Sequence, residues 1–296
     1  MCFTAIIKST KLMGIYMYKK SKWATEIIKY QDSEGKWGYF HTLSKDSKSP
    51  YTTEKALKRL EILGYTIKDD CIQKAVSYMN DCLLGVKEIP DRQEKIADWN
   101  VFTSLILATW IRRFTKDNSN ANNVAKNWSN IITVAFEDGK YNHQKYINAY
   151  LNIWGMKPKG GKLVDFVQFY IISIVNGYLD KETEQRFLEY IINRPKGIYY
   201  TYEKCINNLP FDFNSKNSSW YLGCIELLSE YETAKYQLQF VVEWIKNNKL
   251  QNGKWDMGQS VKDGLYFPLS DNWRKAEIRE SDCTYRISKL LMKLSI

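Results

Sequence analysis

The apolar residues of this chain recur mostly at the spacing of an amphipathic helix. Within residues 52–63, Ala56, Leu57, Leu60 and Leu63 fall at i, i+1, i+4 and i+7, which places them on one helix face. The pattern predicts about eleven helices, at residues 21–30, 52–63, 71–84, 94–114, 120–136, 144–154, 161–178, 181–192, 215–229, 234–247 and 280–294. Strand-like alternation is almost absent, apart from the short segment G-I-Y-Y-T-Y. The chain is therefore predicted to be all-α.

Glycines interrupt these helices at a nearly regular interval. Gly35, Gly85, Gly139, Gly197 and Gly253 lie 50 to 58 residues apart, and each is preceded and followed by a helical segment. Four of them are followed closely by an aromatic residue, in G-K-W-G-Y-F, G-K-Y-N-H, G-I-Y-Y and G-K-W-D-M, whereas Gly85 is not. This period indicates a repeat of helical hairpins. The alternative is that glycines simply end helices in loops.

Two of these units share a longer motif, a helix followed by Gln and then by Gly-x-Trp. Residues 23–37 read W-A-T-E-I-I-K-Y-Q-D-S-E-G-K-W, and residues 241–255 read V-V-E-W-I-K-N-N-K-L-Q-N-G-K-W. Residues 52–64, T-T-E-K-A-L-K-R-L-E-I-L-G, follow the first motif as its next helix. The pattern resembles the QW repeat of squalene–hopene cyclases and, more broadly, the prenyltransferase and terpene-cyclase repeat family.

The motif residues are predicted to join adjacent hairpins rather than to contact a ligand. A Gln amide donates and accepts at once, so it can bridge the end of one helix to the start of the next. The Gly permits a tight reversal with positive φ, and the Trp covers the joint with a large apolar surface. The residues with this structural role are Gln31, Gly35, Trp37, Gln251, Gly253 and Trp255.

The resemblance implies an α/α toroid, in which about eleven or twelve helices alternate between an inner and an outer ring around a central cavity. Residues 17–296 would form this single domain, while residues 1–16 are expected to be a disordered leader or to precede the true start of translation. The inner helices would open their N-termini at one end, where unpaired N–H groups favour anions. The cavity mouth is therefore the expected site.

The catalytic motifs of that family are not found in this sequence. The nearest string to the acid motif D-x-D-D is T-I-K-D-D, which has Ile67 where the first Asp should be, and D-D-C-I-Q does not match the magnesium motif D-D-x-x-D. The family zinc site uses an Asp, a Cys two residues later and a distant His. Here Asp282 and Cys283 are adjacent, with His41 as the third ligand. No cofactor is expected, and zinc at these three residues is kept open.

Polar and aromatic residues at the predicted inner-helix starts are the candidates for lining the cavity. They are Tyr39, Phe40, His41, Thr53, Glu54, Asp98, Trp99, Asp271, Trp273, Arg274, Asp282, Tyr285 and Arg286. For His41, Glu54 and Asp98 the alternative is a structural role, as a hydrogen-bonded His, a helix-dipole partner and a polar residue early in a helix. Residues 256–274 form a long loop, which is expected to be either a functional lid or a structural cover.

Composition limits the partners of the chain. The formal net charge of +10, with a pI of about 9.1, fits either a Lys-rich solvated surface or an anionic ligand. No Lys/Arg tract is longer than a pair such as Arg112-Arg113, so a nucleic-acid interface is not expected. The six cysteines make no C-x-x-C pair, and we expect reduced thiols in a cytoplasmic protein. No segment has the roughly 18 apolar residues of a membrane span.

Two functions are consistent with these features. The first is binding of a small or lipid-like, anionic ligand, such as an isoprenoid or phosphorylated molecule, in a central aromatic cavity, with catalysis of an unknown reaction left open. The second is a non-catalytic helical-repeat module that binds a protein or peptide on a concave surface. A pocket with polar and aromatic lining favours the first function, and an open, shallow centre favours the second.

Overall fold

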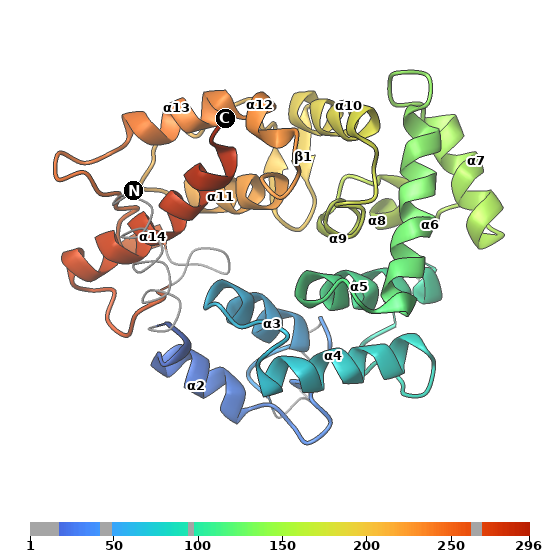
Figure 1. Cartoon of the computed structure of the whole chain (residues 1–296), viewed down its shortest axis with the longest axis horizontal. Helices are drawn as coiled ribbons and strands as arrows, with labels where there is room; N and C mark the ends of the chain where they lie inside the picture. The colour runs from blue at the N-terminus through green and yellow to red at the C-terminus, as the bar shows by residue number, and fades with distance from the viewer. Residues whose placement is uncertain (1–17, 42–48, 94–97, 262–267) are drawn as a thin grey trace, which may run out of the picture. The chain divides into compact units, whose positions relative to one another are not determined.

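Helices dominate the structure, as their apolar spacing predicts. The computed structural model describes residues 18–41, 49–93, 98–261 and 268–296, so the predicted leader at residues 1–16 lies outside the described residues. Thirteen α-helices and one 3-10 turn, against a single two-stranded ribbon, make up the secondary structure of these described segments (Figure 1). The predicted all-α class is confirmed.

The bounds of the elements follow the sequence pattern closely. The helices are α2 (Lys22–Lys29), α3 (Thr53–Ile62), α4 (Asp70–Leu83), α5 (Trp99–Phe114), α6 (Ser119–Phe136), α7 (His143–Trp154), α8 (Gly161–Val164), α9 (Phe169–Ile174), α10 (Lys181–Asn193), α11 (Lys216–Leu228), α12 (Ala234–Gln237), α13 (Gln239–Asn247) and α14 (Ala276–Leu294). The 3-10 turn is η1 (Gln259–Val261), and the strands are β1 (Lys196–Ile198) and β2 (Tyr202–Lys204). The G-I-Y-Y-T-Y segment therefore contains the turn of the ribbon.

Capping side chains explain where several helices begin. Ser21, Thr52, Asn142, Asp180 and Ser215 each precede a helix, and each side chain accepts a backbone N–H from the first turn of that helix. These bonds satisfy donors that have no partner within the helix. Because caps are local, they fix the helix starts independently of the rest of the fold.

Two predicted helices are interrupted. The helix expected at residues 161–178 is split into α8 and α9, because the chain between them runs extended beside the turn of the ribbon. There Phe169 N–H donates to the carbonyl of Tyr199 (3.2 Å), and Tyr199 N–H donates to the carbonyl of Val167 (3.2 Å). The helix expected at residues 234–247 is broken at Leu238, which gives α12 and α13.

The described residues group into two compact units. The first takes the described residues of 1–94, 106–122 and 269–271, and the second takes those of 95–105, 123–268 and 272–296. In the first unit, α2 packs against α3. Whether residues 17–296 close into one ring stays a prediction.

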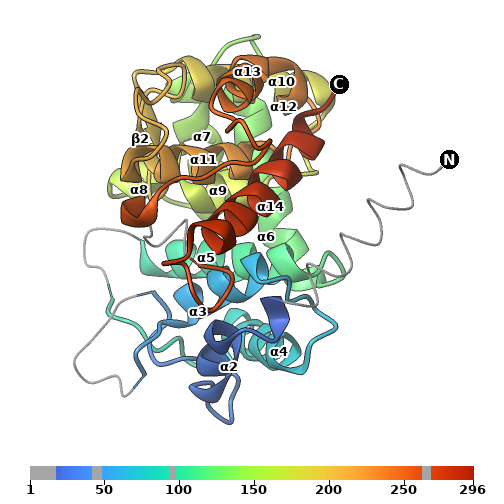
Figure 2. The same cartoon turned by 90° about the vertical axis from the view of Figure 1, so that its left-hand side faces the viewer.

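The second unit is layered. Figures 1 and 2 show α10, α12 and α13 in one layer, and α8, α9 and α11 in another, so that the chain crosses between the layers after α9, after α10 and after α11. The helix α10 packs against α12 and β1, and α11 packs against α9 and β2. The two strands are antiparallel, with Lys196 opposite Lys204 and Ile198 opposite Tyr202.

None of the helices in the described part of the chain combines the length and the apolar composition of a membrane span.

Candidate functional site

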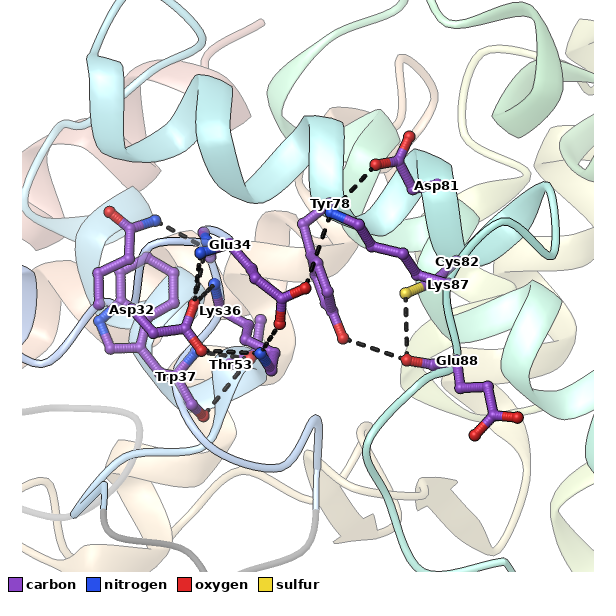
Figure 3. A network of polar contacts seen from close by, with 12 residues as sticks. Asp32, Glu34, Lys36, Trp37, Thr53, Tyr78, Asp81, Cys82, Lys87 and Glu88 are labelled. Atoms are coloured by element: carbon purple, nitrogen blue, oxygen red, sulfur yellow. Dashed lines mark hydrogen bonds and ion pairs between the residues drawn. The ribbon is translucent and has the colours of Figure 1, made fainter.

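The first Gly-x-Trp motif forms a closed joint in the first unit. Trp37 is fully buried, and its indole N–H donates to the carbonyl of Ile27 (2.7 Å). Its backbone N–H donates to the hydroxyl of Thr53 (3.0 Å), and Figure 3 shows these two residues beside one another. The Gln31 amide donates to the carbonyl of Gly35 (2.9 Å) and to the carbonyl of Cys71 in α4 (2.7 Å). These bonds give Gln31, Trp37 and Thr53 structural roles.

The second motif repeats the same joint in the second unit. The indole N–H of Trp255 donates to the carbonyl of Ile245 (2.8 Å), and its backbone N–H donates to the hydroxyl of Thr284 (3.0 Å). Both indole bonds reach ten residues back along the chain, and both motif glycines, Gly35 and Gly253, have positive φ. The two motifs are therefore equivalent in three dimensions as well as in sequence.

Gln251 does not have the predicted bridging role. It precedes its Trp by four residues, whereas Gln31 precedes its Trp by six. The shorter spacing places Gln251 on the exposed turn, where it makes no hydrogen bond to the described residues. The position equivalent to Gln31 is Lys249, whose ammonium lies 5.1 Å from the centre of the Trp255 ring. At this joint a lysine ammonium therefore lies over the indole, at the position where the first joint has the bridging amide of Gln31.

The third glycine turn has the same backbone but leaves an opening. Gly139 N–H donates to the carbonyl three residues back (2.9 Å) and φ is +82°, as in the turn at Gly35 (3.1 Å, φ +101°). A Cβ on Gly35 would lie 2.5 Å from the backbone oxygen of Lys74 in α4, so that helix closes on the turn. A Cβ on Gly139 would meet only the Arg186 guanidinium of α10, at 3.5 Å. The third turn therefore faces a side chain instead of a helix backbone.

A pocket opens at this third turn, entirely within the second unit. Its volume is about 770 Å³, which is in the range of about 300–1,000 Å³ that is typical of small-molecule sites. It is bounded by the end of α6 and the turn after it, by the C-terminal half of α10, and by the start of β1. The lining residues are Phe136, Gly139, Lys140, Tyr141, Arg186, Glu189, Tyr190, Asn193, Arg194, Pro195 and Lys196.

The charges of the lining are predominantly positive. Lys140, Arg186, Arg194 and Lys196 line the pocket with a single carboxylate, that of Glu189. The two lysines are exposed and make no ion pair within the part of the chain that the structure describes. Lys140 does act electrostatically on the Asp138 carboxyl, whose pKa is lowered mainly by its hydrogen bond from Lys145. Neither lysine is held in an ion pair of the described segments, so both can turn toward an anion that enters the pocket.

The two arginines are held in place by carboxylates outside the lining. The Arg194 guanidinium makes two parallel bonds to Asp165, of 2.9 and 2.6 Å. Burial alone would lower the pKa of Arg194, but its hydrogen bonds to Asp165 raise that pKa above its ordinary value. Arg186 pairs with Glu182 one turn earlier on α10. Both guanidinium groups are thus oriented before a ligand arrives.

Aromatic rings form one wall of the pocket. The centres of the Tyr141 and Tyr190 rings are 4.7 Å apart, and Phe136 lies 5.6 Å from the first ring and 5.8 Å from the second. Phe166 stacks behind Tyr190 at 5.7 Å. Burial raises the pKa of Tyr141 well above its ordinary value, so its phenol is neutral at physiological pH. The wall therefore offers apolar faces and neutral hydroxyls beside the cations.

The predicted candidates of the first unit are mostly built into the fold. Phe40 is buried, and Thr53 belongs to the first Trp joint. Tyr39 is half-buried, and its carbonyl accepts the N–H of Thr53 (2.9 Å). The Glu54 carboxylate accepts the indole N–H of Trp110 (3.0 Å).

Two further candidates of the first unit pair with polar groups elsewhere in that unit. The His41 ring contacts the Asp91 carboxylate through Nδ1, and its backbone N–H donates to the same carboxylate (2.8 Å). The exposed Asp271 accepts the N–H of Lys22 at the start of α2 (2.9 Å). The carboxylate of Asp91 thus fixes the orientation of the His41 ring.

The candidates of the second unit lie on helix ends and on α14. Asp98 accepts the N–H of Val101 (2.9 Å), as a helix cap does, and Trp99 contacts Phe102 at 6.1 Å. Trp273 is buried. Arg274 is exposed, and its backbone carbonyl accepts a hydrogen bond from the side-chain amide of Gln259 (3.1 Å). Residues 262–267 of the predicted loop lie outside the described residues.

On α14, Arg286 is bound to a carboxylate of α11. Its guanidinium donates to Glu226 at 3.2 and 2.7 Å. Asp282 is buried on the same helix, and Tyr285 is half-buried, which raises the pKa of its phenol. None of the thirteen cavity candidates is among the residues that line the pocket at Gly139.

The zinc hypothesis finds no support among the described residues. They contain no group of three His, Cys, Asp or Glu side chains that could hold a metal ion. His41 belongs to the first unit, and Asp282 and Cys283 belong to the second. Burial raises the pKa of the Cys283 thiol to about 12, so the metal-free thiol is protonated at neutral pH.

Comparisons with family models, with curated proteins and with solved structures find no match for this chain. The residues of the pocket must therefore be interpreted from their own chemistry.

Sequence reasoning identified one part of this pocket and missed the rest. The sequence predicts Gly139 and its G-K-Y motif as one of the repeat turns, and assigns it no binding role. The missed residues are the cations of α10 and β1. A usable signal was the R-P-K string directly before Gly197, which places two cations beside the next repeat glycine.

Proposed function

We propose that the chain binds a small ligand with a phosphate or carboxylate group and an apolar part, in the pocket at Gly139. The observation that carries the proposal is the convergence of four cationic side chains on an aromatic wall, with one carboxylate among them. Two of the cations make no ion pair in the described segments, and the other two are oriented by carboxylates. A carboxylate or diphosphate group matches this charge pattern, because charge-assisted bonds to Arg and Lys are the strong ones.

The aromatic wall suits the apolar part of such a ligand. The tyrosine and phenylalanine rings are packed against one another at 4.7 to 5.8 Å, so their faces are rigid and lose little entropy on binding. A prenyl diphosphate combines an anionic head with an apolar chain and is the model ligand for this site. The proposal covers binding only and assigns no reaction to the lining residues.

The helical arrangement is part of the same proposal. We propose that the hairpins belong to an α/α toroid of the terpene-cyclase-like kind, and the equivalence of the joints at Trp37 and Trp255 supports this. A cytoplasmic location, expected from the cysteine pattern, is retained as a prediction.

Calorimetric titration with geranyl diphosphate, inorganic pyrophosphate and geraniol tests the binding proposal. We expect geranyl diphosphate to bind most tightly, because only this ligand uses both the cations and the rings. Neutralising Lys140 and Lys196 together (Lys140→Gln with Lys196→Gln) should weaken its binding about tenfold or more, since each lysine can make a charge-assisted bond.

A matched control removes the same charge from the same part of the protein. Lys126 and Lys181 are exposed, lie outside the pocket lining, and belong to the two helices that bound the pocket, α6 and α10. The double variant Lys126→Gln with Lys181→Gln should bind geranyl diphosphate as the wild type does. Equal weakening in both double variants would mean that the ligand senses net charge only, and the pocket would be rejected. Capture of an acidic peptide in preference to all three ligands would favour a peptide-binding module.

A further inference from the structure

A second aromatic cluster in the second unit surrounds a lysine ammonium. The Nζ atom of Lys162, in α8, lies 5.0 Å from the centre of the Phe102 ring and 5.1 Å from the centre of the Tyr200 ring. These distances are within the limit of about 6 Å for a cation–π contact. Phe102 belongs to α5 and Tyr200 to the turn of the ribbon, so rings from two separate segments flank one positive charge of α8.

A third ring supports the two rings that flank the ammonium. Tyr170, in α9, packs edge-on against Phe102 at 5.9 Å and against Tyr200 at 5.6 Å. Tyr170 is buried, so it fixes the positions of the two rings that flank the ammonium. We call Phe102, Tyr170 and Tyr200 the aromatic cage. Cages of a few such rings are the usual way in which proteins hold quaternary ammonium groups.

The backbone at Tyr200 is strained to hold its ring in this place. Its φ is +68°, and it is the one non-glycine residue with positive φ among the described residues. A bulky side chain is rare in this conformation, which a turn of this kind usually gives to Gly or Asn. Strain of this sort persists where the surrounding structure requires it and is concentrated at functional sites. Here the strained position places a ring against a cation.

The cage is accessible from solvent. The Tyr200 side chain is 39% exposed, as is the neighbouring Tyr199, and Lys162 is half-buried. A lysine side chain has a long and flexible stem, so its ammonium can leave the rings for water without a movement of the backbone. A weakly hydrated cation could then take its place.

We propose that the aromatic cage is a binding site for the ammonium group of a small cationic ligand, and that the Lys162 ammonium occupies this seat as an internal competitor. Because the rings lie at cation–π distance from a positive charge, the expected ligand group is a methylated or quaternary ammonium. This site is separate from the basic pocket, shares no residue with its lining, and takes a ligand group of the opposite charge.

Tetramethylammonium, observed by NMR through its methyl signal at constant ionic strength, is the probe. Removing the competitor with Lys162→Met should tighten its binding about tenfold, because the ammonium that competes for both rings is lost. The control Lys159→Met removes an equal charge from an exposed lysine in the loop before α8 and should leave the affinity unchanged. The neutral analogue tert-butyl alcohol should not bind to either variant.

Tyr200→Gly separates binding from structure. Glycine accepts a φ of +68° without strain, so this variant should unfold at the wild-type temperature or above it, yet lose tetramethylammonium binding in the Lys162→Met background. Retained binding without the Tyr200 ring would overturn the proposal. So would an absence of saturable binding to Lys162→Met, or equal binding of tert-butyl alcohol. Unfolding of the Tyr200→Gly variant at a clearly lower temperature would assign the ring to stability and would also reject the cage.

Discussion

Truncating Trp37 should cost more stability than almost any other single change in the first unit. The side chain is fully buried, and its indole N–H is bonded to the carbonyl of Ile27 at 2.7 Å. Trp37→Ala removes roughly 200 Å² of buried surface and leaves a cavity, at a cost of about 3–5 kcal/mol. With a urea dependence of about 2 kcal/mol per molar, the unfolding midpoint should fall by about 2 M. Because domains have only about 5–15 kcal/mol of stability, the variant should be close to unfolded at 37 °C.

Finer changes at the same joint separate its contributions. Thr53→Val leaves the buried N–H of Trp37 without its acceptor and should cost about 1–3 kcal/mol, whereas Thr53→Ser keeps the hydroxyl and should cost less. Trp220 provides the control, because its side chain is 44% exposed. Trp220→Ala should change stability by no more than about 1 kcal/mol.

Urea titration followed by circular dichroism measures all four variants. A loss of less than about 1 kcal/mol in Trp37→Ala would refute the structural role of the joint. A cost in Trp220→Ala equal to that in Trp37→Ala would refute it as well, because burial would then not decide the effect.

Three further predictions concern the second Trp joint, the glycine turns and α14. Burial opposes ionisation of Asp256, but hydrogen bonds from Arg279 lower the pKa of its carboxyl below the ordinary value. The stability that this pair contributes is therefore present at neutral pH and lost as the pH falls through the lowered pKa, so in thermal unfolding wild type and Asp256→Asn should differ at pH 7 and converge only at a pH below the ordinary pKa of an aspartate. Gly35→Ala should destabilise more than Gly253→Ala in urea titration, because a Cβ would lie 2.5 Å from a backbone oxygen of α4 in the first case and no closer than 3.9 Å to any atom in the second. Burial raises the pKa of the Cys283 thiol to about 12, so mass spectrometry should show maleimide labelling of this residue only after unfolding.

Most helices could be predicted because their signals are local. The faces of residues 52–63 and 181–192 and the capping side chains that precede them depend only on neighbours along the chain. The break between α8 and α9 could not be predicted this way, because it is caused by pairing with Tyr199, some thirty residues later. Gln251 was also not predictable from its residue type alone. Both motifs contain Gln, Gly and Trp, but Gln251 lies two residues nearer to its Trp than Gln31 does, and this places its amide on the surface.

The site was harder to predict than the fold for the same physical reason. A pocket depends on where one segment fails to close on another, and the sequence around Gly139 resembles the closed joint at Gly35. The difference comes from the partner helix, where α10 presents Arg186 toward the turn while α4 presents its backbone. Cations from the turn after α6, from α10 and the residue that follows it, and from β1 then meet at positions up to 56 residues apart in the sequence.

Hydrogen–deuterium exchange with and without geranyl diphosphate tests ligand binding in this pocket most directly. Binding at the pocket should slow exchange in residues 136–142 and 186–196, which contain its lining, and leave the joints at Trp37 and Trp255 unchanged. Protection confined to other residues, or no protection at a saturating ligand concentration, would contradict the proposed site.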